Sequence, residues 1–199
     1  MKTPIFKLLV IALTLTITSC KKDVKLSEFK YADKGIVVDC EKFDLKLLNE
    51  ALFSFESDIL KAYGNSKDNL SRPYSQYVRG AVYNSIKYNK IASKQSINIA
   101  KVLKTKTDLW SNNKLNYNSN LFKCLTEKIK SNDLKRTINA LTKTNTMSKK
   151  VFGPAVLSSY RSAVTDKYLA AYIALDFFYP NLFDLKEENI EAAKTEVAK

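Results

Sequence analysis

Apolar residues that recur every three or four positions constrain the fold of this chain more than any other feature. The clearest stripe consists of Leu45, Leu48, Leu52, Phe55, Ile59 and Tyr63. This spacing places all six side chains on one face of an α-helix. Asp44 is positioned to cap the start of that helix and Gly64 to end it. A helix with one apolar face must bury that face against other elements.

Similar stripes predict further helices along the chain. One helix is predicted after Pro73, and the next from Ser93 or Ser96 to before Asp108. Two more are predicted over 121–129 and over 134–141, the second capped by Asp133. A further helix is predicted to start at Gly153 and Pro154, and the last to cover 168–179 after Asp166. The segment 168–179 is apolar on nearly every side, which predicts a central helix that stops around Pro180. Helices therefore account for most of the predicted structure.

Glycine is sparse, with four residues in 199, and no Asn-Gly or Asp-Gly pair marks a hairpin. The segment 111–120 contains five asparagines and is predicted to be a loop. We therefore predict an all-α fold, a single bundle of roughly six to eight helices behind a short N-terminal tether. The helical domain is expected over 41–185, followed by a C-terminal helix or tail over 186–199.

The first 19 residues have the layout of an export signal. Lys2 and Lys7 precede the apolar stretch 8–17, and small side chains follow at Thr18 and Ser19. Only 13 uncharged residues extend from 8 to 20, whereas a helix that crosses a bilayer needs about 20. The pattern predicts a cleaved signal peptide over 1–19 rather than a transmembrane helix.

The sequence Ile17, Thr18, Ser19, Cys20 resembles the lipobox of bacterial lipoproteins. The resemblance implies that a diacylglyceryl group joins Cys20, that cleavage occurs before it, and that a further acyl chain such as palmitate is added. Several acyl chains anchor a protein firmly. An ordinary secretory signal is the alternative. The resemblance implies a lipidated N-terminus at the cell envelope. The charged residues that follow lack a helical apolar stripe and predict a tether, so that the lipidated N-terminus and tether cover 20–40.

The residues after Cys20 bear on which membrane surface carries the protein. Lys21, Lys22 and Asp23 resemble the short charged export signals of surface lipoproteins in the Bacteroidota, although that pattern normally has two acidic residues. We expect the outer membrane, with the periplasmic and surface leaflets both open.

Two cysteines remain once Cys20 is assigned to the lipid. Cys40 and Cys124 could form a disulfide, because exported proteins live where disulfides persist. Cys124, however, falls in an apolar helical segment, where a free cysteine behaves as a small buried hydrophobe. We favour the free, buried cysteine and keep the disulfide as the alternative.

Charge is distributed unevenly along the chain. Residues 61–160 hold 19 basic and 4 acidic side chains, whereas 20–60 and 161–199 each have a net charge of −2. Such an excess can attract anionic polymers or lipids. Because 29 of the 33 basic residues are lysines, and arginine suits phosphate recognition better, we favour solvated lysine faces. Nucleic acid is not a favoured partner.

The chain contains no histidine. This removes the commonest general base and metal-binding side chain, together with the Ser-His-Asp and Cys-His arrangements. Its glycines are too far apart for a phosphate-binding loop, and no metal site or cofactor is predicted. The acidic residues lie mainly near the two ends, on segments predicted to be exposed. An enzyme is therefore not favoured.

Asp176 is the only charged residue in the apolar segment 168–179. A buried carboxylate is costly without a partner, and we predict that Arg79 or Arg161 supplies one. A buried ion pair that sets helix register is the favoured interpretation. The functional alternative is a polar pocket built from Asp176, Arg79, Arg161, Tyr77, Tyr160 and Tyr172.

Together these features predict a lipid-anchored cell-envelope protein that acts as a non-catalytic binding or interaction module. Its expected partners are the membrane, through Cys20, and an envelope protein or anionic envelope polymer. Two alternatives remain. One is a histidine-independent envelope hydrolase acting on glycans with paired carboxylates; the other is a binder of anionic polymer or lipid through residues 61–160.

Overall fold

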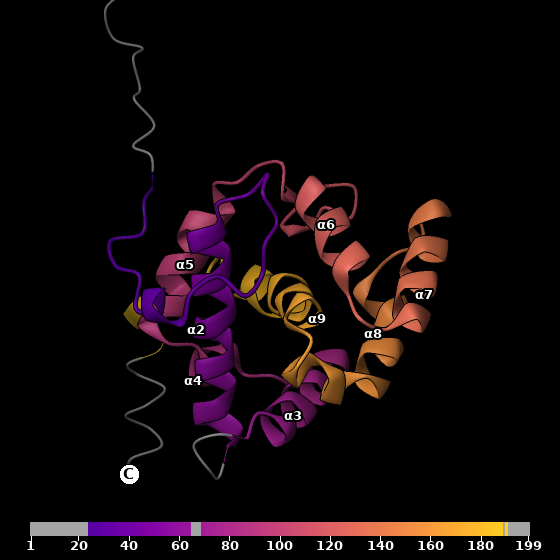
Figure 1. Cartoon of the computed structure of the whole chain (residues 1–199). Coiled ribbons are helices and arrows are strands. Elements are labelled where there is room, and N and C mark those ends of the chain that lie inside the picture. The colour runs from indigo at the N-terminus through magenta and orange to yellow at the C-terminus, as the bar shows by residue number, and fades with distance from the viewer. Residues whose placement is uncertain (1–23, 65–68, 189, 191–199) are drawn as a thin grey trace, which may run out of the picture.

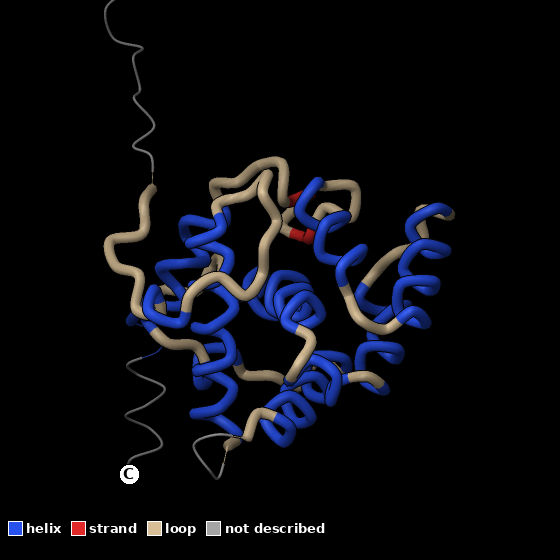
Figure 2. The backbone as a smooth tube through the Cα atoms, in the orientation of Figure 1, coloured by secondary structure: helices blue, strands red, loops and turns tan. Residues whose placement is uncertain are grey.

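The fold is all-α. The computed structural model describes residues 24–64, 69–188 and 190. Within these residues it contains eight α-helices and one two-stranded sheet (Figure 2). The predicted bundle of six to eight helices is therefore confirmed. The predicted signal peptide, the predicted lipidation site Cys20 and most of the predicted C-terminal segment lie outside the described residues.

Helix α2 (Leu45–Tyr63) is the longest element. The Asp44 side chain accepts a hydrogen bond from the Leu47 amide at 3.0 Å, and Gly64 is the C-cap, as the sequence predicts. This cap satisfies an amide that has no partner inside the helix. The apolar face of α2 is buried in the core.

Helix α9 (Lys167–Ile173) lies at the centre of the molecule, surrounded by the other helices (Figure 1). Asp166 caps it by accepting from the Leu169 amide. The helix continues into a π-helical turn, η3 (Ala174–Phe178), and then a 3₁₀ turn, η4 (Tyr179–Leu182). The predicted central helix is confirmed, but its π-helical part was not predicted.

The remaining elements surround α9. They are η1 (Ala32–Lys34), α3 (Ser71–Val82), α4 (Tyr88–Ile91), α5 (Lys94–Lys104), α6 (Asn120–Lys128), α7 (Asn132–Lys143), α8 (Lys149–Ser158) and η2 (Tyr160–Val164). In Figure 1, α2 and α5 lie on one side of α9, and α6, α7 and α8 on the other. The core thus forms around a single buried helix.

Two predicted helix starts are wrong. Helix α7 is capped by Ser131, whose hydroxyl accepts from the Leu134 amide, and not by Asp133. Helix α8 begins after Ser148, which caps the Val151 amide, so that Pro154 lies inside the helix. In both cases a serine two or more residues earlier satisfies a free amide and moves the start toward the N-terminus.

Several acidic side chains expected at the surface are buried on α2. Glu50 accepts hydrogen bonds from the amides of Lys30 and Tyr31 at 2.8 and 2.9 Å. The side chain of Asn49 accepts a hydrogen bond from the Val38 amide and donates one to the Val38 carbonyl. Glu50 is 2% exposed. These contacts pack much of the predicted tether onto the domain, because the side chains of α2 satisfy the backbone of the arm.

The predicted loop 111–120 begins with a hairpin. Strand β1 (Trp110–Ser111) pairs antiparallel with β2 (Lys114–Leu115). The two residues between them, Asn112 and Asn113, both have positive φ, 52° and 58°. A two-residue hairpin of this kind needs positive φ at both central positions, and asparagine tolerates that conformation better than most residues.

Candidate functional site

Asp176 lies at the centre of a buried polar cluster. It belongs to the π-helical turn η3 and is 0% exposed. Tyr172, one turn earlier, donates a hydrogen bond to one carboxylate oxygen at 2.8 Å. Tyr117, from the connector between β2 and α6, donates to both oxygens at 3.2 Å. Short π-helical segments within α-helices often occur at functional sites.

Lys149, in the first turn of α8, supplies the positive charge that acts on this carboxyl. Burial raises the pKa of Asp176 to about 6, and Lys149 and the two tyrosine hydroxyls oppose that rise. Burial also lowers the pKa of Lys149. Groups perturbed by burial and by a specific charged partner are typical of functional sites, although structural networks share this property.

The predicted partners of Asp176 are wrong. Arg79 and Arg161 are exposed, and Arg161 donates to the hydroxyl of Tyr160 at 3.2 Å instead. Hydrogen bonds from Ser75 and Arg161 lower the pKa of Tyr160. Helix α3 packs on η2 with these side chains at the solvent side, where guanidinium groups remain hydrated.

Of the predicted polar pocket, only Tyr172 hydrogen bonds to Asp176. Tyr77 lies in the aromatic core, with its ring centroid 4.9 Å from that of Phe55 and 6.0 Å from that of Phe178. The structure therefore divides the predicted pocket into three parts. Asp176 and Tyr172 form a buried hydrogen-bonded pair, Tyr77 belongs to the aromatic core, and the remaining residues lie at the surface: Arg79, Tyr160 and Arg161.

A surface hollow of about 320 Å³ lies over Tyr117. Its lining residues come from the β1–β2 hairpin, the following connector and the connector between α7 and α8: Ser111, Asn112, Lys114, Leu115, Asn116, Tyr117, Asn118, Thr142, Asn145 and Met147. The ring of Tyr117 packs edge-on against Phe122, with centroids 5.1 Å apart. The buried carboxylate and this ring contact hold Tyr117 in place.

Several polar groups of this hollow are unengaged. The side-chain amides of Asn112, Asn118 and Asn145 make no hydrogen bond with other described residues, nor does the ammonium of Lys114. The hydroxyl of Thr142 is buried without a partner among the described residues. Asn112, Lys114, Asn118 and Asn145 are exposed, so water solvates them, and a ligand in this concave surface must replace the hydrogen bonds of the water that it displaces.

The backbone presents two of these amides directly. Asn112 and Asn145 both have positive φ, 52° and 55°, a conformation that few residues other than glycine and asparagine adopt readily. Glycine would satisfy the same backbone without offering a side chain. Asparagine suits these turns, and at both positions it also adds a side-chain amide to the lining of the hollow.

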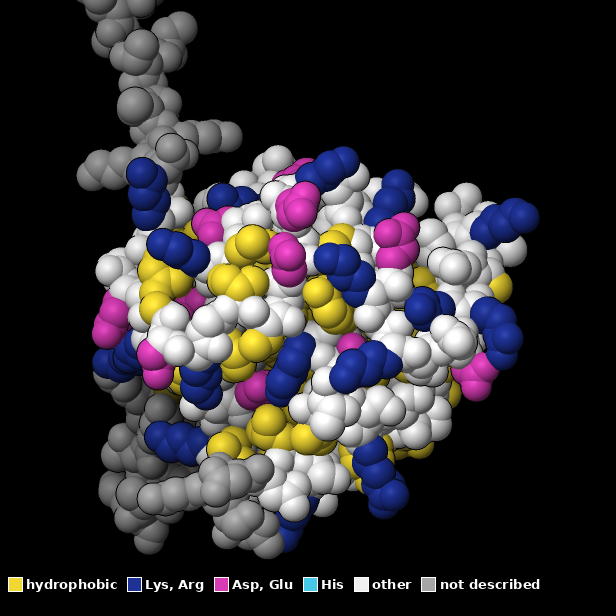
Figure 3. Space-filling view, in the orientation of Figure 1, with side chains coloured by type: hydrophobic (Ala, Val, Ile, Leu, Met, Phe, Trp, Pro, Cys, Tyr) yellow, Lys and Arg dark blue, Asp and Glu magenta, His cyan; other side chains and the backbone are white. Residues whose placement is uncertain are grey.

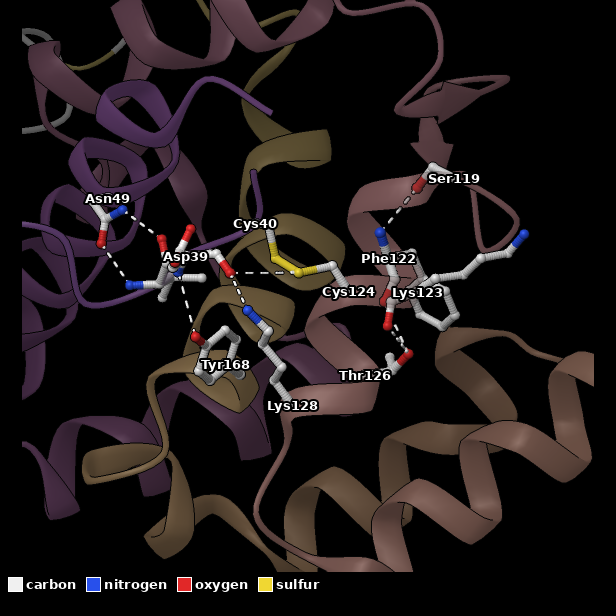
Figure 4. The surroundings of a disulfide bond; sticks show 11 residues. Asp39, Cys40, Asn49, Ser119, Phe122, Lys123, Cys124, Thr126, Lys128 and Tyr168 are labelled. Carbon is white, nitrogen blue, oxygen red and sulfur yellow. Dashed lines mark hydrogen bonds between the residues drawn. A yellow bond between two sulfur atoms is a disulfide. The ribbon is translucent and has the colours of Figure 1, made fainter. Parts of the chain in front are cut away.

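A disulfide joins Cys40, in the N-terminal arm, to Cys124 on α6 (Figure 4). The favoured interpretation of Cys124 as a free buried cysteine is therefore wrong. The Cα atoms are 5.9 Å apart across a sequence separation of 84 residues. Lys128 donates to the carbonyl of Asp39 at 2.7 Å beside the bond, so two contacts hold the arm on α6.

A second hollow, of about 480 Å³, adjoins this disulfide. It contains the two carboxylates Glu41 and Glu127 together with Lys42, Lys123 and Lys128. All five side chains are exposed. This mixture is typical of solvated surface charge, whereas a general acid in a glycosidase sits where burial raises its pKa.

The uneven charge of the sequence is partly cancelled in space. Lys101 and Lys104, from the basic segment 61–160, pair with Glu187 at 3.2 Å and Asp184 at 2.9 Å near the C-terminus. On the face shown in Figure 3, Lys and Arg side chains are interspersed with Asp and Glu side chains. That face offers no continuous basic surface for an anionic polymer.

Sequence reasoning missed Lys114, Tyr117 and Lys149 as members of the site. The available signal was the Asn-Asn pair between Trp110 and Leu115, which marks a hairpin that can carry a pocket. No sequence pattern identified Lys149 as a site residue, because only the packing of α8 brings it near Asp176.

The described residues contain no group of three or more His, Cys, Asp or Glu side chains able to hold a metal ion. Within the same part of the chain, every helix is too short or too polar to cross a membrane. No protein-family model matches the chain, and it matches neither a curated protein nor a solved structure.

Proposed function

We propose that this protein is a lipid-anchored protein of the cell envelope that acts as a non-catalytic binding module, and that its ligand occupies the hollow over Tyr117. The observation that carries the binding proposal is the set of unengaged amides and the Lys114 ammonium around one concave surface. Largely preformed hollows with a few convergent polar groups are the usual form of ligand sites.

The position of Asp176 favours binding over catalysis. A general acid or base must come within hydrogen-bond reach of the reacting group, yet Asp176 is 0% exposed and Tyr117 lies between it and the hollow. Its carboxylate receives hydrogen bonds from Tyr117 and Tyr172. The carboxylate therefore acts to position Tyr117, which lines the hollow.

The proposed anchor places the domain close to the membrane. Val24, the first described residue, is four positions after Cys20, and a fully extended chain spans at most about 3.6 Å per residue. The arm that follows is bound to α2 through Glu50 and Asn49. If Cys20 is acylated, the start of the arm lies within about 14 Å of the lipid-bearing residue.

The anchor is tested by expressing the chain and its Cys20→Ser variant in a bacterium that processes lipoproteins. We expect the mature wild-type chain to begin at Cys20, to carry acyl mass and to partition with membranes, because several acyl chains bind firmly. The variant should lose the acyl mass and the partition. Intact mass spectrometry and membrane fractionation measure both. A wild-type chain without acyl mass would contradict the anchor.

The binding site is tested by substituting tryptophan for Asn118, which fills the hollow from an exposed position. Envelope polysaccharide, peptidoglycan fragments and lipid extract are titrated in turn into the ¹⁵N-labelled full-length chain. We expect one fraction to shift amide resonances around the hollow, and N118W to abolish those shifts. Gln76→Trp, on the exposed side of α3, is the matched control and should bind normally. Equal binding by both variants would place the ligand elsewhere.

A further inference from the structure

We infer that the hollow over Tyr117 recognises an acidic sugar, meaning a hydroxyl-rich ring that carries one carboxylate. This inference rests on the proposed binding function and names its ligand class. It follows from the kinds of polar group at the site, the net charge they leave and the size of the hollow.

The first argument comes from the amides. Asn112, Asn118 and Asn145 each offer a carbonyl oxygen that accepts and an amino group that donates. A sugar hydroxyl likewise donates one hydrogen bond and accepts others. A wall of free amides therefore matches a ligand with several hydroxyl groups, whereas an apolar ligand would leave those amides desolvated and unpaired.

The second argument comes from charge. Lys149 acts on the buried carboxylate of Asp176, so these two charges compensate each other. Lys114 lies close enough to lower the pKa of Lys149, and it has no acidic partner among the described residues. One positive charge is thus left uncompensated at the hollow, which favours a ligand with a single negative charge.

The same inventory argues against other ligand classes. A peptide or amino acid with an ammonium group would need a carboxylate at the surface of the hollow, but Asp176 is sealed behind Tyr117. No arginine lines the hollow, and arginine is better suited than lysine to grip a phosphate in a bidentate manner. A volume of about 320 Å³ lies at the small end of ligand sites.

The test compares four probes by calorimetry on the purified full-length chain: glucuronic acid, its neutral amide glucuronamide, glucose and glucose 6-phosphate. We expect glucuronic acid to bind about tenfold more tightly than glucuronamide, the difference made by one charge-assisted hydrogen bond. Lys114→Gln should remove this preference and leave weak binding of both sugars. Lys90→Gln, on the exposed side of α4, is the matched control and should retain the preference.

A second variant separates the amides from the charge. In Asn145→Gly the new residue, glycine, also tolerates the positive φ, so the variant removes the side-chain amide and leaves the backbone conformation unchanged. We expect it to weaken glucuronic acid and glucuronamide by the same factor. Unfolding curves for each variant establish that the domain is folded, so that lost binding reports on the site.

Three outcomes would overturn the inference: equal binding of glucuronic acid and glucuronamide, tighter Lys114-dependent binding of glucose 6-phosphate, or no binding of any probe. A failure of the ligand class can be told apart from a failure of the proposed binding function. If an envelope fraction still shifts the resonances of the hollow and N118W blocks that effect, the binding function stands and only the ligand class is wrong. If neither occurs, both proposals fail.

Discussion

Breaking the disulfide between Cys40 and Cys124 is expected to lower the free energy of unfolding by about 4 kcal/mol, the largest effect we predict for any single bond in this domain. The bond closes a loop of 84 residues, and in the chain-entropy model a longer loop restricts the unfolded chain more. A loss of this size is a large fraction of the stability of a typical domain.

The measurement is urea unfolding of a Cys20→Ser background, in which no third thiol can exchange with the bridge. Cys40→Ser, Cys124→Ser and the double variant should all lose the same amount, because each removes the same bond. Dithiothreitol should destabilise the chain that keeps both Cys40 and Cys124 by a similar amount, and it should leave the stability of the double variant unchanged. If the two single losses added in the double variant, the effect would come from local packing rather than from the cross-link.

The second large effect is a dependence of stability on pH that originates at Asp176. Burial raises the pKa of this carboxyl from its ordinary value of 3.8 to about 6 in the folded chain. Between these values the folded state holds a proton that the unfolded state releases. The contribution to stability is therefore present at low pH and is lost as the pH rises through about 6. From pH 4 to pH 7 we expect a loss of about 2 to 3 kcal/mol.

Asp176→Asn isolates this contribution. Its side-chain oxygen can still accept from a tyrosine hydroxyl, but it does not titrate. Other carboxylates are common to both chains, so the difference in unfolding free energy between wild type and variant reports on Asp176 alone. We expect that difference to shift against the wild type by the amount above between pH 4 and pH 7. Parallel curves would contradict the raised pKa.

Tyr172→Phe provides a second check on the same group. The Tyr172 hydroxyl donates to the carboxylate at 2.8 Å, and this hydrogen bond lowers the pKa of Asp176. Its removal favours the protonated carboxyl further. The midpoint of the stability loss should therefore move to higher pH in this variant, whereas a purely structural defect would lower stability equally at every pH.

Most of the helical architecture could be predicted from local pattern. The stripe from Leu45 to Tyr63, the cap at Asp44 and the apolar segment after Asp166 each depend on neighbours within a few residues. Hydrogen bonds inside a helix and its caps are local, so periodicity and cap residues report them well. Errors arose where two local signals competed, as at Ser131 against Asp133.

The composition of the candidate site could be predicted only in part. Asp176 was identified because a single charge in an apolar segment needs a partner, and Tyr172 lies one helical turn away. Arg79 and Arg161 were predicted as partners on the basis of charge alone. The structure instead uses tyrosine hydroxyls and Lys149, because packing against η3 decides which side chains reach the carboxylate.

The sequence by itself determined the helical fold class, the central position of the apolar segment and the presence of a buried carboxylate, because each follows from spacing along one segment. The tertiary structure alone decided which partners Asp176 has, that Cys40 meets Cys124, and that an Asn-lined hollow forms over Tyr117. Apart from Tyr172, one helical turn from Asp176, these contacts join residues tens of positions apart, and their proximity depends on how whole helices pack. Local pattern carries no record of such contacts.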